Sequence, residues 1–180
     1  MKVLVVYCHP VAESFCAAMR DAALRGLARA GHETRLLDLY AENFDPRLSR
    51  AERIDYQDEV RNAASVADHV AHLEWAEGLV FVFPTWWYGL PAMLKGWFDR
   101  VWLPGVAFHM PERGKVIRPG MTHIRALAGI TSCGSPWWWA MFPLTRSGAR
   151  FAVRCAGVVM PMPPQSATSR NSSMRRRGSH

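Results

Sequence analysis

The sequence LVFVFPTWWYGLPAMLKGWFDRV, residues 79–101, contains a strand, a loop and a helix in succession. It begins with an unbroken apolar run, as in strands that are buried on both faces of a parallel sheet. Pro91 favours a helix start, because the N–H that proline lacks would have no partner in the first turn. Three adjacent aromatic residues, Trp86, Trp87 and Tyr88, stand where the strand should reach solvent. We expect them to cover a flat, apolar ligand. The alternatives are that they form a hydrophobic plug or a dimer contact.

Strands and helices alternate along the rest of the chain. Apolar runs predict further strands at residues 2–7, 32–39, 123–131 and, shorter, 155–159. Apolar residues at helical spacing predict helices at residues 14–31, 63–76 and, more weakly, 137–153. Residues 41–61 are polar and should form a surface connection with a helical turn or two. The alternation predicts an α/β fold: a doubly wound parallel sheet with helices on both faces, in three layers and a single domain.

The length of 180 residues suffices for one domain, which we assign to residues 1–160. Residues 161–180 are rich in proline, serine and arginine and lack periodicity, so we expect a disordered basic tail. The formal net charge is +7. Residues 170–180 contain four arginines and no acid and so contribute +4, which leaves +3 for the rest of the chain. A solvated tail without a nucleic-acid partner is therefore favoured, with an RNA-binding arm as the alternative.

Nothing in the sequence indicates export or stable membrane insertion. No apolar run approaches the roughly 20 residues that span a membrane, and MKVLVVYCHP is read as a first strand instead of a signal peptide. The cysteines lack the spacing of a zinc site or a disulfide framework, which fits a reducing cytoplasm. They are Cys8, Cys16, Cys133 and Cys155. Buried thiols are the favoured interpretation, and a redox pair of Cys8 and Cys133 is the alternative.

A metal site is not expected. His69 and His72 lie three residues apart on a predicted helix, but no third ligand accompanies them. A solvent-facing position is the favoured interpretation for both.

In an open parallel sheet, ligands bind at the carboxyl ends of the strands. This rule selects three loops: CHPVAESFC at residues 8–16, PTWWYGLP at residues 84–91 and TSCGSPWWW at residues 131–139. The first loop leads into a helix N-terminus, whose free N–H groups and dipole favour phosphate. His9 and Ser14 can donate to a phosphate oxygen, although a turn residue and a helix cap are the alternatives. The loop has neither GxGxxG nor GxxxxGK[ST], which excludes the Rossmann and Walker motifs.

The other two loops offer a surface for a planar heterocycle. Backbone amides of the second loop can bond the edge of such a ring, while its aromatic side chains shield the face. In the third loop, Thr131, Ser132 and the Gly134 N–H can meet polar ring atoms, and Trp138 can cover the ring. Core tryptophans after a plain turn are the alternative for the third loop.

Two stretches, HPVAESFCAAMRDAA at residues 9–23 and FPTWWYGLPAMLKGWFDRVWLPGVAF at residues 83–108, resemble the flavodoxin-like NAD(P)H:quinone oxidoreductase family. This family includes the modulator-of-drug-activity proteins and the potassium-efflux ancillary reductases. TSCGSPWWW matches the third loop of the family less closely. The resemblance covers roughly residues 1–155 and implies a flavodoxin-like fold.

The resemblance further implies a non-covalent flavin, FAD or FMN, with its phosphate on the first loop and its ring on the other two, and NAD(P)H as co-substrate. Carried over by position, the cofactor-binding residues are His9, Ser14, Phe15, Cys16, Pro84, Thr85, Trp86, Trp87, Tyr88, Thr131, Ser132, Cys133 and Gly134. The family usually has asparagine in place of Cys16, and glycine or tyrosine in place of Cys133. Its catalytic tyrosine and histidine have no clear counterpart here, so no catalytic residue is assigned. Beyond about Cys155 the chain leaves the family pattern.

The implied function is two-electron transfer from NAD(P)H to a quinone or similar acceptor in the cytoplasm, with the chemistry supplied by the flavin. Two alternatives remain: an electron-transfer flavodoxin that uses no nicotinamide, and a regulatory flavin-binding subunit of a transporter. Flavodoxins are commonly acidic, whereas this chain is basic. We also expect a homodimer, because Trp97, Trp102, Phe108 and Met110 offer more apolar surface than the sheet can cover.

Overall fold

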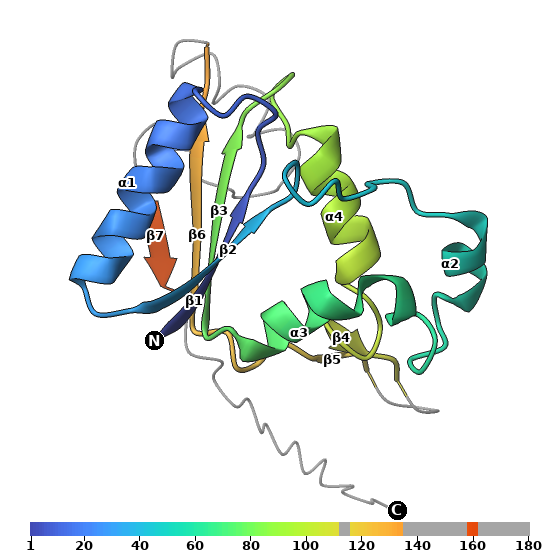
Figure 1. Ribbon diagram of the computed structural model, residues 1–180. Helices are drawn as coiled ribbons and strands as arrows, with labels where there is room; N and C mark the ends of the chain where they lie inside the picture. The colour runs from blue at the N-terminus through green and yellow to red at the C-terminus, as the bar shows by residue number, and fades with distance from the viewer. Residues whose placement is uncertain (112–115, 135–157, 162–180) are drawn as a thin grey trace, which may run out of the picture.

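A five-stranded sheet with the strand order β2-β1-β3-β6-β7 forms the centre of the molecule (Figure 1). The computed structural model describes residues 1–111, 116–134 and 158–161. The strands are β1 (Lys2–Tyr7), β2 (Glu33–Asp38), β3 (Gly78–Pro84), β6 (Ala126–Ser132) and β7 (Val158–Pro161). β1 pairs in parallel with β2 and β3, and β3 pairs in parallel with β6. This order is that of a flavodoxin-like sheet, so the predicted fold class is confirmed.

Helices cover both faces of the sheet, and they bury the apolar side chains that β1 directs to each face. Val3, Val5 and Tyr7 pack against α1 (Phe15–Arg29), whereas Leu4 and Val6 belong to the core on the opposite face. That face is covered by α3 (Ala67–Trp75) and α4 (Ala92–Val101), with the 3-10 helix η1 (Ala64–Val66) before α3. The remaining elements are α2 (Arg50–Asp55) and a small hairpin of β4 (Phe108–His109) and β5 (Arg118–Pro119). The three predicted layers are therefore present.

The last strand differs from its prediction in place and direction. β7 begins at residue 158 instead of 155 and runs antiparallel to β6, with Ala126 opposite Pro161. An antiparallel edge strand on an otherwise parallel sheet is common, and a short apolar run contains no information about its direction. The helix predicted at residues 137–153 lies outside the described residues. Pro161 belongs to β7, and the disordered tail predicted beyond it stays a prediction.

The connection between β2 and α3 is clamped to α4 by a half-buried ion pair. Glu52 forms a capping box with Ser49 at the start of α2 and also binds Arg100 of α4 at 2.5 Å. Burial opposes the ionisation of Glu52. Hydrogen bonds from Ser65, Ser49 and Arg100 outweigh burial and lower its pKa to about 2. The predicted surface connection is thus anchored to the helix that follows the aromatic loop.

Two expectations about side chains on this side of the sheet are wrong. Trp97 is fully buried, and its Nε1–H donates to Nδ1 of His69 at 3.2 Å. α4 directs Trp97 into the core against Phe81, so it cannot contribute to a dimer surface. The His69 side chain is only 15 % exposed, and burial together with the nearby His72 lowers its pKa. His69 is therefore a hydrogen-bond acceptor in the core wall, not a solvent-facing residue.

The other residues of that expected dimer surface are partly or largely covered. Trp102 and Phe108 are half-buried, while Met110 is 41 % exposed. Trp102 packs edge-on against Phe98, at 4.6 Å between ring centroids. A homodimer would need a different apolar surface.

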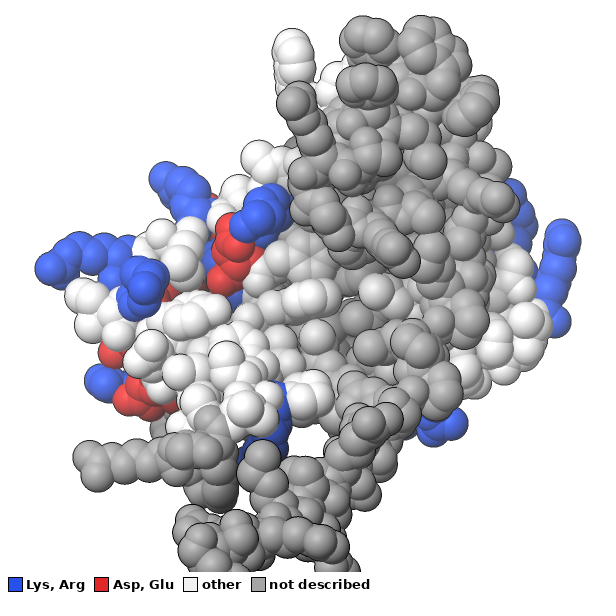
Figure 2. All heavy atoms as spheres, turned by 180° about the vertical axis from the view of Figure 1, so that it is seen from behind, with Lys and Arg blue, Asp and Glu red and all other residues white. Residues whose placement is uncertain are grey.

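Charged side chains are mixed on the face of the molecule shown in Figure 2. On the side where α2 lies, at the left of this view, Lys and Arg alternate with Asp and Glu. Ion pairs in the segment between β2 and α3 join Arg47 to Asp45, and Arg61 to Asp55 and Asp58. Within the described ranges, no helix is both long enough and apolar enough to cross a membrane.

Gly96, the one glycine of α4, should not tolerate a larger residue, because a Cβ there would overlap the carbonyl oxygen of Pro46. We expect Gly96→Ala to lower the free energy of unfolding by about 1–3 kcal/mol, the usual cost of overpacking. Gly26→Ala in α1 is the matched control, since a Cβ there meets nothing within 4 Å and should stabilise the helix by about 0.5–1 kcal/mol. Urea unfolding of both variants checks this, and equal effects would contradict the close approach.

Candidate functional site

The three predicted loops meet at the carboxyl ends of β1, β3 and β6. Parallel pairing places Pro84 opposite Ser132 at the exits of β3 and β6. Thr85 then ties the second loop to the third: its N–H donates to Ser132 O at 2.8 Å, and its Oγ1 lies 2.7 Å from Thr131 Oγ1. The first loop joins them through His9, whose ring centroid is 6.0 Å from that of Trp86. The predicted juxtaposition is therefore observed for the first two loops and for residues 131–134 of the third, the part of that loop that the structure describes.

Ser14 is the N-cap of α1, as its type and position predict. Its Oγ accepts the Ala17 N–H at 3.1 Å and lies 3.4 Å from the Tyr7 hydroxyl. The first N–H that donates within the helix is that of Ala18, to Ser14 O at 3.2 Å, so the helix itself does not satisfy the N–H groups of Phe15 and Cys16. Among the described residues these two N–H groups have no hydrogen-bond acceptor, so the loop presents helix-start donors beside the Ser14 hydroxyl, and such a group of donors suits an anion.

The ring of His9 is held by its own loop. Nδ1 lies 3.1 Å from the Val11 N and 3.2 Å from the Val11 O. In the tautomer that accepts the Val11 N–H, the proton is on Nε2, which then faces away from this turn as a donor. His9 can thus offer one N–H to a ligand without losing its loop contact.

Phe15 and Cys16 differ in how they could reach a ligand. The Phe15 side chain is 72 % exposed, while Cys16 is only 2 % exposed. Burial raises the pKa of the Cys16 thiol to about 11, so it stays a neutral, weak donor. For both residues the backbone N–H is the better group for binding an anion.

The second loop makes a tight turn of unusual composition. Trp86 and Gly89 exchange backbone hydrogen bonds of 3.0 and 3.2 Å. Between them, Trp87 and Tyr88 have φ angles of 50° and 59°. A two-residue turn with both φ angles positive is of type I′ and normally contains glycine, asparagine or aspartate. Two bulky aromatic residues there impose backbone strain, and strain of this kind is concentrated at binding sites.

The turn borders a cavity of about 210 Å³, whose lining residues are Thr85, Trp87, Tyr88, Cys133 and Gly134. Trp87 is 97 % exposed, which leaves its ring free to cover an incoming molecule. A Cβ at Gly134 would meet none of the described residues within 4 Å. Trp138, proposed from sequence to cover the ring, lies outside the described residues.

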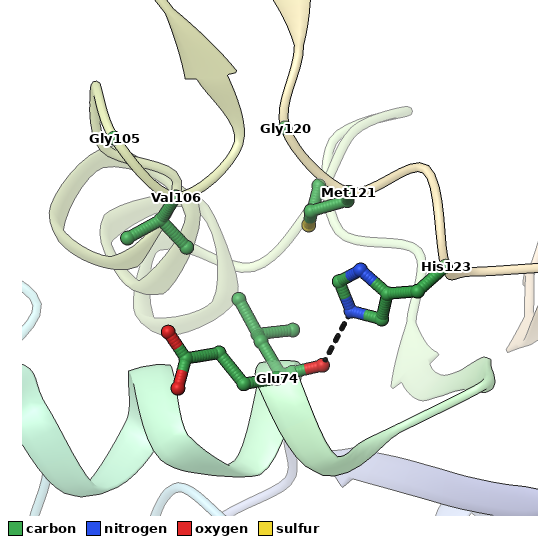
Figure 3. A pocket seen from close by; sticks show the side chains of 7 residues that line it. Glu74, Gly105, Val106, Gly120, Met121 and His123 are labelled. Atoms are coloured by element: carbon green, nitrogen blue, oxygen red, sulfur yellow. Dashed lines mark hydrogen bonds between the residues drawn. The ribbon is translucent and has the colours of Figure 1, made fainter.

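A second hollow, of about 270 Å³, lies near the amino ends of the strands, between α3 and the segments before β4 and β6 (Figure 3). His123 approaches the α3 backbone there, with Nε2 3.1 Å from Leu73 O, and the Glu74 carboxylate belongs to the lining. Although it is larger, the hollow lacks the sheet position typical of ligand sites, and its carboxylate disfavours phosphate. The carboxyl-end cavity is therefore the candidate site.

Tyr7 lies beside the site but is not among the site residues predicted from the sequence, which places it only at the end of a buried strand. It is 1 % exposed, and burial raises the pKa of its hydroxyl, which therefore stays protonated. The signal in the sequence is its place: a polar tip ends an otherwise aliphatic strand, just before the first loop.

Comparison with known proteins agrees with this geometry. Residues 1–143 match a family model described as flavodoxin-like fold. The ribosyldihydronicotinamide dehydrogenase (quinone) of Homo sapiens is 35 % identical over 126 residues, which cover 61 % of this chain and 54 % of that protein. NAD(P)H dehydrogenase (quinone) 1 of Cavia porcellus is 36 % identical over 153 residues, 74 % of this chain and 54 % of that protein. The chain thus spans about half the length of the curated relatives it matches.

Among solved structures, the NAD(P)H:quinone oxidoreductase from Methanothermobacter marburgensis is similar, with a TM-score of 0.71 and 32 % sequence identity. The match covers 81 % of this chain and 73 % of that one. The chain therefore belongs to the flavodoxin-like fold family, and within it to the NAD(P)H:quinone oxidoreductases.

Proposed function

We propose that the protein binds a flavin, FMN or FAD, and uses it to transfer two electrons from NAD(P)H to a quinone or similar acceptor. The main support is that the second and third loops line one cavity at the carboxyl ends of β3 and β6, while the first loop, at the end of β1, lies beside it through the contact of His9 with Trp86. Family membership supports the same reaction class. A cytoplasmic location is supported by Cys8, Cys16 and Cys133, which are free thiols.

The residues of the first loop suit the phosphate of a flavin. Its donors are the N–H groups of Phe15 and Cys16, the Ser14 hydroxyl and Nε2 of His9, all beside the positive end of the α1 dipole. Hydrogen bonds from neutral donors to a charged phosphate are stronger than those between neutral groups. An anion would thus be held without a buried cation.

The other two loops suit the ring of a flavin. Trp87 and Tyr88 line the cavity together with Cys133 and Gly134, and Trp86 offers a further aromatic ring beside His9. Pro84, Thr131 and Ser132 have supporting roles, because they fix the exits of β3 and β6. When bound, the flavin would supply the two-electron chemistry. The protein would bind it, orient it and shield one part of it from water.

The proposed activity can be measured directly on the purified protein. We expect NADH or NADPH to be oxidised when both a flavin and 1,4-benzoquinone are present, and not when either is omitted. Nicotinamide absorbance follows the reaction, with FMN and FAD compared in parallel. Flavin binding without nicotinamide oxidation would indicate an electron-transfer or regulatory flavoprotein, and the absence of flavin binding would overturn the proposal.

The strained turn allows the role of Trp87 to be separated from its effect on stability. Trp87→Gly should relieve a left-handed conformation that costs about 1–2 kcal/mol, partly offset by the roughly 0.5–1 kcal/mol entropy cost of glycine. The flavin-free protein should therefore be as stable as wild type or more stable. Loss of the ring should weaken flavin binding several-fold, because a stacked aromatic contact contributes about 0.5–1.5 kcal/mol.

Trp87→Ala is the matched control, since it removes the ring but keeps the strain. It should weaken flavin binding to the same extent without stabilising the flavin-free protein. Thermal melts and flavin fluorescence titrations measure both effects. Unchanged affinity in both variants would show that Trp87 does not contact the cofactor.

We further propose a homodimer whose interface surrounds the mouth of the site. Exposed apolar side chains gather on the first two loops: Val11 is 51 %, Phe15 72 %, Trp87 97 % and Leu90 40 % exposed. A patch of this kind usually marks a protein interface. We expect a dimer by sedimentation velocity at micromolar concentration, and dissociation by Leu90→Glu. A monomeric wild type would contradict this arrangement.

A further inference from the structure

We propose that Tyr7 is a positioning residue for anion binding: its buried hydroxyl turns the Ser14 hydroxyl proton toward the phosphate of the cofactor. The proposal deepens the proposed function and rests on it. Tyr7 closes β1 directly beneath the first loop, and its hydroxyl oxygen lies 3.4 Å from Ser14 Oγ. Tyr7 would not touch the ligand but would act through Ser14.

The number of hydrogen bonds that one hydroxyl can form supports this role. A serine hydroxyl has two acceptor lone pairs and one proton. The Ala17 N–H donates to Ser14 Oγ at 3.1 Å and so occupies one lone pair. If Tyr7 donates as well, both lone pairs are occupied, and the Ser14 proton must point away from the helix and from the core. The direction that remains leads to the open side of the loop, where an anion would sit.

Tyr7 is the better donor of the pair because of where its oxygen lies. The residue is 1 % exposed, and its side chain lies between the sheet and α1 in a buried cluster with Val5, Val82 and Ala17. In the described part of the chain, Ser14 is the hydrogen-bond partner found for the Tyr7 hydroxyl. If Tyr7 accepted instead, its own proton would be buried without a partner, which is unfavourable. Ser14 is half-buried and can direct its proton to solvent or ligand.

The nearby cation does not make this hydroxyl redundant. The Arg20 guanidinium lies 4.7 Å from the centre of the Tyr7 ring, but it binds Asp21 at 2.8 Å and approaches Asp38 at 3.9 Å. Its charge is therefore already balanced by carboxylates. Anion binding then depends on neutral donors, for which the direction of each proton matters.

The test compares flavins with and without a phosphate. In Tyr7→Phe, which removes one oxygen and keeps the ring over which Arg20 lies, we expect FMN to bind about two- to ten-fold more weakly, since one oriented hydrogen bond is lost. Riboflavin, which lacks the phosphate, should bind as it does to wild type. Tyr56→Phe, at the C-cap of α2, is the matched control and should leave both affinities unchanged. Fluorescence titration measures the affinities, and urea unfolding measures stability.

A double-mutant cycle with Ser14→Gly tests the route through Ser14, since glycine is a tolerated N-cap. In the Ser14→Gly background, Tyr7→Phe should have no further effect on FMN affinity. Wild-type affinity for FMN in Tyr7→Phe, an equal loss for FMN and riboflavin, or additive losses in the cycle would each overturn the role of Tyr7. Failure of wild type to bind any flavin would instead overturn the proposed function, and this inference with it.

Discussion

The burial of β1 on both of its faces is the constraint on which the rest of the structure depends. β1 pairs with β2 on one edge and β3 on the other, and its residues from Val3 to Tyr7 are almost entirely inaccessible to solvent. A strand of this kind requires apolar cover above and below, which α1 supplies on one side and α3 and α4 on the other. Helices that join parallel strands must cross from one end of the sheet to the other. The loops that leave the carboxyl ends of the strands therefore gather in one place, and the candidate site follows from this arrangement.

Strands and helix starts whose residue types follow from burial or capping could be predicted from the sequence. The apolar runs predict β1 and β3 to within a residue or so, and Ser14 marks the start of α1. These features depend on local composition and spacing. The direction of β7 could not be predicted in this way, because it depends on how the preceding segment returns to the sheet. The orientation of Trp97 was also missed, since a wide apolar helix face does not specify which tryptophan the sheet covers.

At the candidate site, residue types were easier to predict than conformations. The sequence indicates that aromatic residues follow β3, but it gives no reason to place Trp87 and Tyr88 in left-handed backbone conformations, which their side chains disfavour. Tertiary context overrides the local preference there: Thr85 is fixed by the β6 exit, and α4 begins at Ala92. The contact between Tyr7 and Ser14 was likewise hidden, because it joins a strand end to a helix start across the sheet face.

Because β7 runs antiparallel to β6, it finishes at the end of the sheet opposite the candidate cavity, which is useful for protein engineering. Its last residue, Pro161, lies opposite Ala126, the first residue of β6, at the end of the sheet where the parallel strands begin. The candidate cavity is at the opposite end, where β3 and β6 finish. A fluorescent reporter or an immobilisation anchor joined directly after this strand would therefore start from the end of the sheet remote from the candidate cavity. Spectroscopic or surface-based measurements of flavin binding could then be made with the mouth of the site unobstructed.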